Sequence, residues 1–99
     1  MAFSPADTTL PRAVAVFVDD DTLSVDLSDG RSIATPLAWH PRLAYATLAE
    51  RSKWRLIGGG EGIRWPDLDE DISVKSLLGG EPSGESQVSL QRWLTARQS

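Results

Sequence analysis

Residues 13–37 read AVAVFVDDDTLSVDLSDGRSIATPL, and this stretch contains the clearest strand pattern of the chain. Its first six residues are all apolar, which predicts a strand that is covered on both faces or lies at a dimer contact. In the next run, apolar residues at positions 23, 25 and 27 alternate with polar ones, which predicts a strand with one buried face. Asp29-Gly30 predicts a tight hairpin turn, and a third strand follows from Arg31 to Leu37. The stretch therefore predicts a three-stranded antiparallel meander.

The middle of the chain predicts one helix and one further strand. Thr47 and Glu50 have the spacing of a capping box, in which a hydroxyl and a carboxylate satisfy free amides at a helix start. We expect this helix to carry Leu48, Trp54 and Ile57 and to end at Gly58, before a flexible glycine-rich connection. Residues 63–65 predict a fourth short strand, which ends at a proline.

The C-terminal third predicts two more helices. Ser73 can cap a short helix that contains Leu77 and Leu78. Residues 85–97 suit a second helix with a narrow apolar stripe. We therefore expect an α+β fold in which a small antiparallel sheet, a three-stranded meander plus a fourth short strand, packs with two to three short helices. Residues 1–12 are expected to form a loose arm and residues 13–80 a single domain. Residues 81–99 should be a linker and a helix that packs on the domain or at a dimer contact.

Composition excludes several classes of protein. The 99 residues contain no cysteine, which excludes disulfides and thiolate metal sites and favours a reducing, cytoplasmic location. No apolar segment is long enough to cross a membrane, and the N-terminus does not resemble a signal peptide. The net charge of −4 disfavours nucleic acid as a partner. A dimeric nucleic-acid-binding regulator stays open as an alternative, because basic residues gather in one region: Arg42, Arg51, Lys53, Arg55 and Arg64.

Candidate catalytic and metal sites are weak throughout. Asp67, Asp69 and Asp71 have the spacing that begins a calcium loop, but the required glycine and glutamate are missing at the sixth and twelfth positions. The glycine run 58–62 follows a predicted helix and lacks the Lys-Ser or Lys-Thr pair of a phosphate loop. His40 is the only histidine and has no nucleophile motif around it. We therefore expect no enzyme activity, no cofactor and no metal.

The side chains suited to protein contact lie in two short segments. Four tryptophans in 99 residues is a high count, and tryptophan is common in the energetic centres of interfaces. A run of acidic residues next to such aromatics favours a small basic protein as the partner. The predicted docking surface comprises Trp39, His40, Arg42, Trp65, Asp67, Asp69 and Asp71. Because the core of so short a chain is modest, we also expect a homodimer.

Three segments carry a resemblance to a known family. These are Pro36-Leu37-x-Trp39-x-Pro41-Arg42-Leu43, Trp54-Arg55-Leu56-Ile57-Gly58 and Trp65-Pro66-x-Leu68-Asp69-Glu70-Asp71-Ile72-Ser73. Together with their surroundings they resemble the domain-of-unknown-function 2442 family of small bacterial proteins over about residues 13–80. The resemblance implies a β-sheet-plus-helix module with no settled activity. Members are often encoded beside another short protein, as in toxin–antitoxin pairs, and some are fused to a helix-turn-helix.

The chain also departs from the pattern of that family. Members commonly have tyrosine at the position of His40 and histidine at the position of Arg64. If the family used that histidine for chemistry or for a metal, this chain could not do so in the same way, and the departure also argues against a catalytic role for His40. The tail is too short to hold a helix-turn-helix. The leading interpretation is a non-enzymatic interaction or regulatory module, the antitoxin-like partner of a small bacterial two-gene system.

Overall fold

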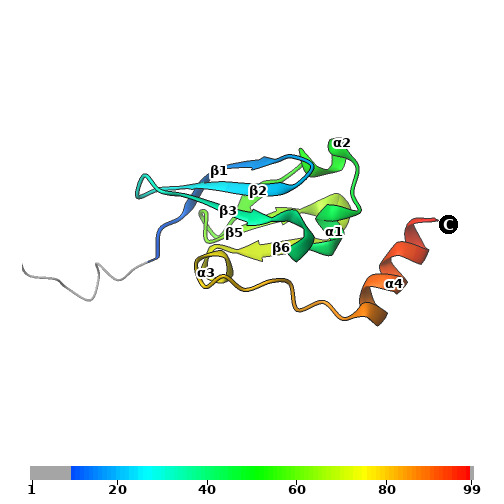
Figure 1. Ribbon diagram of the computed structural model, residues 1–99. Helices are drawn as coiled ribbons and strands as arrows, with labels where there is room; N and C mark the ends of the chain where they lie inside the picture. The colour runs from blue at the N-terminus through cyan, green and yellow to red at the C-terminus, as the bar shows by residue number, and fades with distance from the viewer. Residues whose placement is uncertain (1–9, 99) are drawn as a thin grey trace, which may run out of the picture.

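The computed structural model describes residues 10–98, which form two small antiparallel sheets and several short helices (Figure 1). The first sheet has the order β1-β2-β3 and the second the order β4-β5-β6. The strands are β1 (Ala13–Val18), β2 (Thr22–Leu27), β3 (Ser32–Pro36), β4 (Arg55–Ile57), β5 (Gly62–Trp65) and β6 (Glu70–Ser73). The fold is therefore α+β, as predicted. Nine residues of the expected N-terminal arm, 1–9, lie outside the described part of the chain.

The predicted meander is confirmed as the first sheet. Leu23 and Val25 are fully buried, and the turn at Gly30 has a φ of +92°, a conformation that favours glycine. The first strand differs from the prediction, because the pairing of β1 with β2 shifts by one residue between Ala13 and Ala15. This bulge leaves Val14 and Phe17 55% and 59% exposed. The strand is therefore not covered on both faces by the described residues.

The predicted helix through Ile57 is wrong. The capping box of Thr47 and Glu50 is present, but α2 (Leu48–Arg51) ends after a single turn. Residues 55–57 instead pair with β5 as strand β4, because the glycines that follow build a tight turn between the two strands. Gly58, Gly59 and Gly60 all have positive φ, and Gly60 is buried against β1, where its carbonyl accepts a hydrogen bond from the Ala13 amide at 2.8 Å. The glycine run is thus a packed turn rather than a flexible connection.

The predicted fourth strand exists but belongs to the second sheet. Ile63 and Trp65 lie in β5, the central strand of β4-β5-β6, so the meander itself has three strands only. The predicted acidic loop is also shorter than expected. A 3-10 turn, η3 (Pro66–Leu68), is followed by Asp69 in the left-handed conformation, and β6 then begins at Glu70.

The remaining helices are short, and they cover the sheets and their ends. They are η2 (Leu37–Trp39), α1 (Pro41–Ala44), α3 (Val74–Leu78) and α4 (Gln87–Arg97). Ser73 caps α3 as predicted, accepting a hydrogen bond from the Ser76 amide. From α3 the chain runs as an extended segment past β6 to α4 at the other end of the molecule (Figure 1). None of the helices within residues 10–98 has the length and apolarity that a bilayer crossing requires.

One hydrophobic core holds the two sheets together. Its cluster contains Leu23 and Val25 of the first sheet, Ile63 and Trp65 of the second, and Leu43 of α1. Full burial of side chains of this size contributes roughly 1.5–3 kcal/mol each to folding. Helix α4 contacts the same core through Trp93, which is partly buried against the cluster, and Leu90 of the same helix is also buried.

Candidate functional site

Arg42 connects three segments that are distant in the sequence. From α1 its guanidinium donates to the carbonyls of Leu68 and Asp69 at 3.2 and 3.0 Å. It also forms a forked ion pair with Glu85, whose shortest N–O distance is 2.6 Å. The side chains of Arg42 and Glu85 are only 14% and 10% exposed, and Arg42 holds the pKa of the Glu85 carboxyl below its usual value. Through the ion pair and these two hydrogen bonds together, Arg42 ties the segment just before α4 to the end of η3.

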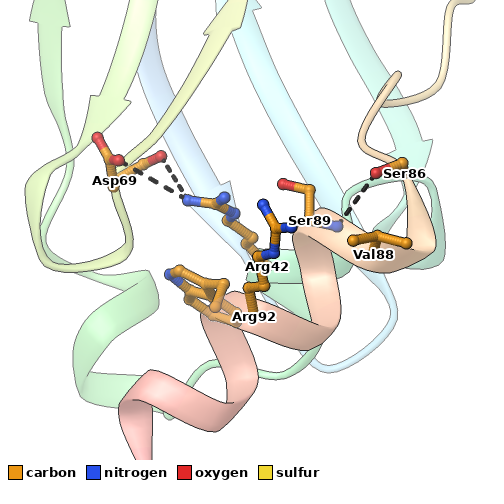
Figure 2. A pocket seen from close by; sticks show the side chains of 7 residues that line it. Arg42, Asp69, Ser86, Val88, Ser89 and Arg92 are labelled. Atoms are coloured by element: carbon orange, nitrogen blue, oxygen red, sulfur yellow. Dashed lines mark hydrogen bonds and ion pairs between the residues drawn. The ribbon is translucent and has the colours of Figure 1, made fainter.

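A groove lies between α4 and η3 beside Arg42 (Figure 2). Its volume is about 390 Å³, and Asp69, Val88 and Arg92 contribute to its wall. Much of its polar surface already has partners within the chain. Ser86 accepts a hydrogen bond from the Ser89 amide, as Figure 2 shows, and the Ser89 hydroxyl donates to Glu85 at 2.7 Å.

The three aspartates of the acidic segment, defined as residues 67–71, are exposed and lie close to cations. The side chains of Asp67, Asp69 and Asp71 are 49%, 78% and 55% exposed. Arg64 on β5 bridges Asp69 and Asp71 at 3.1 and 2.9 Å, and Lys53 lies 3.7 Å from Asp67. Arg64 thus holds two carboxylates in place while leaving both accessible from solvent.

A separate cavity lies between β6, the start of α3 and the extended segment after it. It has a volume of about 300 Å³ and is lined by His40, Glu70, Asp71, Ile72, Ser73, Ser76, Glu81, Pro82, Ser83 and Gly84. His40 is 3% exposed, and its Nε2 is buried with no hydrogen-bond partner among the described residues. Burial lowers the pKa of His40, so the ring is neutral at neutral pH. We call this the His40 cavity.

Glu70 has an unusual carboxyl group in the wall of the His40 cavity. Burial raises its pKa from 4.5 to about 7, while Arg42 acts in the opposite direction. Glu85 and Asp71 add repulsion that raises the pKa of Glu70 further. Within residues 10–98, Glu70 forms no ion pair. The carboxyl is therefore half-buried without a compensating cation at bonding distance.

The residues of the predicted docking surface fall into two groups: some are buried or already paired within the chain, and the others are exposed. Trp65 has no exposed surface, and its indole N–H donates to the Arg51 carbonyl at 3.0 Å. It is a core residue, which corrects its predicted role as a partner contact. His40 is likewise buried, and Arg42 is occupied by Glu85. Trp39 is half-buried, and its carbonyl accepts from the Ser83 amide. Of the seven residues, the three aspartates of the acidic segment stay exposed.

The basic residues behind the nucleic-acid alternative do not form one free patch. Arg51 is buried and donates to the carbonyls of Leu43 and Ala44. Arg42 and Lys53 face carboxylates of the chain itself. Arg64 pairs with Asp69 and Asp71, whereas Arg55 is exposed and forms no ion pair within residues 10–98. One such arginine is little positive charge to meet phosphates.

Sequence reasoning missed Glu70, Glu81 and Glu85 as site residues. A signal for Glu70 exists in the two-residue period of β6, which places it on the same face as the buried Ile72. The ion-pair partner of Glu85 is Arg42, which is distant in the sequence, and Glu81 shares its cavity with His40 and with residues of β6. No local pattern therefore indicates either glutamate.

Two comparisons with known proteins bear on this geometry. A crystal structure of a protein of unknown function from Rhodospirillum rubrum ATCC 11170, at 2.75 Å resolution, is similar to the chain with a TM-score of 0.68 and 26% sequence identity. The match covers 83% of this chain and 99% of that chain. No curated protein matches. The model of a family described as protein of unknown function (DUF2442) matches residues 13–83, and the chain therefore belongs to the DUF2442 family.

Proposed function

We propose that the protein is a non-enzymatic protein-interaction module that acts in the cytoplasm as the antitoxin-like member of a two-gene pair. Its partner is a small basic protein. The observation that carries this proposal is the acidic segment, whose three aspartates remain exposed after the chain has folded. From residue 64 to residue 85 the chain has six acidic side chains and two basic ones. This charge balance favours a basic surface as the partner.

Arg64 gives the acidic segment its shape. Because it contacts both Asp69 and Asp71, it fixes the two carboxylates on one side of the β5–β6 pair. A lysine or arginine of the partner can then pair with carboxylate oxygens that are already oriented, which reduces the entropy lost on binding. The other acidic side chains of this region increase the rate of association with a basic partner at low ionic strength.

The neighbouring gene product is the ligand for the test. Its binding to the full chain is measured by calorimetry at about 50 and 200 mM salt, and electrostatic steering should weaken as salt rises. The double variant Asp69→Asn and Asp71→Asn removes two charges, and asparagine tolerates the left-handed backbone of residue 69. We expect its affinity to fall about tenfold or more. The matched control is Asp21→Asn with Glu61→Gln, two exposed acids elsewhere on the surface. Equal affinity of the double variant and the wild type would refute the docking surface.

The proposal includes a homodimer that forms through β1. This strand lies at the edge of the first sheet, and Val14 and Phe17 are exposed on it. At its start this edge is already engaged, because the Ala13 amide donates to the Gly60 carbonyl at 2.8 Å. The proposed contact therefore pairs the exposed apolar side chains of Val14 and Phe17 with those of a second copy.

The homodimer is tested by light scattering on the full chain. Phe17→Asp should give a monomer, whereas Leu48→Asp, on the exposed side of α2, should leave the dimer intact. A wild-type chain that is monomeric at about 100 μM would contradict the homodimer without touching the partner proposal.

A further inference from the structure

We propose that the His40 cavity is a binding site for one cationic group that carries N–H donors, supplied by a lysine or arginine side chain of the protein partner. The inference rests on the proposed function for the source of that side chain. Asp71 lies in both the acidic segment and the cavity wall, whereas Asp67 and Asp69 do not line the cavity.

The first support is the charge of the lining. Glu70, Asp71 and Glu81 contribute carboxylates, and no lysine or arginine is among the lining residues. Asp71 is satisfied by Arg64, but Glu70 and Glu81 form no ion pair within residues 10–98. A half-buried carboxylate without a cation is costly, and a guest cation would remove that cost.

The second support is independent of the acids and comes from His40. A neutral imidazole can accept one hydrogen bond, and a buried polar nitrogen without a partner is unfavourable. The Nε2 of His40 is in this state, and the same residue lines the cavity. An ammonium or guanidinium group in the cavity can donate to the Glu70 carboxylate, and it can donate to the buried Nε2 once the His40 ring turns toward it. An anion would meet the carboxylates and is excluded.

The third support is size. A volume of about 300 Å³ is at the lower end for ligand cavities and suits a single side chain. The walls also include apolar atoms of Ile72 and Pro82, against which the methylene stem of such a side chain can pack.

Small cations test the cavity without the partner. n-Butylammonium and ethylguanidinium are titrated into the full chain, and the imidazole resonances of His40 are followed by NMR. We expect saturable shifts with a dissociation constant of about 1–10 mM. Tetramethylammonium has the charge but no N–H group and should bind at least about tenfold more weakly.

Variants then separate the cavity from the partner proposal. Glu70→Gln should weaken binding of both probes about tenfold or more, and Glu61→Gln, at an exposed site, should leave it unchanged. Absence of a saturable shift, or equal binding by Glu70→Gln, would overturn the cation site. The proposed function would still be judged by the double variant Asp67→Asn and Asp69→Asn, because neither residue lines the cavity.

The source of the cation is decided with the neighbouring gene product. Glu70→Gln should also reduce its affinity for the chain. If the probes bind but this affinity is unaltered, the assignment to a partner side chain fails, and the site takes free amines instead.

Discussion

Two glutamates of this chain, Glu50 and Glu70, are half-buried but occupy opposite electrostatic environments. Glu50 accepts two hydrogen bonds from Arg97 and one from the Thr47 amide, and these hold its pKa down at about 2. Burial raises the pKa of Glu70 to about 7. The chain thus supplies a cationic partner to the Glu50 carboxylate, which stabilises the fold. It supplies none to the Glu70 carboxylate beside the His40 cavity, where we propose that another molecule provides the cation.

The largest effect on the free energy of unfolding is expected from Arg42→Ala, which also changes the environment of Glu70. The substitution leaves the desolvated Glu85 carboxylate without its partner, so we expect the free energy of unfolding to fall by about 2–3 kcal/mol. It also removes the cation that lowers the pKa of Glu70, so that pKa should rise further. Urea unfolding gives the first quantity and NMR titration the second. Arg55→Ala, at an exposed position, is the control. A loss below about 1 kcal/mol for Arg42→Ala would show that Arg42 does not secure α4.

Glu70→Gln should raise the free energy of unfolding, and the size of this increase should depend on pH. The folded-state pKa lies above the ordinary value of 4.5, so the folded chain binds a proton that the unfolded chain has released. Wild-type stability should therefore decrease as pH rises from about 4.5 through about 7. At about pH 8 the glutamine variant should be more stable by about 1 kcal/mol, after allowance for solvent screening. Thermal unfolding at about pH 5 and pH 8 measures this difference, and a variant that is less stable at pH 8 would contradict the burial of an uncompensated charge.

Glu50→Gln is the same substitution at the carboxylate that already has a cationic partner, Arg97. Its folded-state pKa is lowered, so its contribution to stability is present above about pH 4.5 and is lost as pH falls through about 2. The variant should lose about 1 kcal/mol at neutral pH, because glutamine can keep the capping box but not the charged contact of Glu50 on α2 with Arg97 on α4. Thermal unfolding across this pH range is the measurement. A loss that persists unchanged at about pH 2 would indicate a packing effect instead.

The sequence predicted those parts of this architecture that have a local cause. Alternation in residues 22–27, the turn at Asp29-Gly30 and the caps at Thr47 and Ser73 all appear as predicted. The helix through Ile57 failed, because a capping box fixes only where a helix begins. Its length was decided by pairing of β4 with β5, which depends on residues further along the chain.

The candidate site was harder to predict than the fold. An indole such as Trp65 suits an interface and a core equally, and its burial follows from the position of β5 at the centre of a sheet. Glu70 looked like one more member of a solvated acidic run. It lines the same cavity as residues 81–84, a segment that is distant in the sequence and has no periodicity of its own. Distant contacts of this kind decide which charges are satisfied, and a single sequence does not encode them in a readable pattern.

The smallest effect on the free energy of unfolding is expected from Lys53→Ala. This substitution removes the cation beside Asp67, a carboxylate that is exposed, unlike those of Glu50 and Glu70. Lys53 and Asp67 are 66% and 49% exposed and lie 3.7 Å apart, so water screens their attraction. The free energy of unfolding should change by less than about 0.5 kcal/mol. In the proposed complex, however, Asp67 becomes more available to a basic partner, so affinity for the neighbouring gene product should be equal or higher. A lower affinity would mean that the partner needs the positive charge of Lys53, and an acidic partner would then fit the surface better than a basic one.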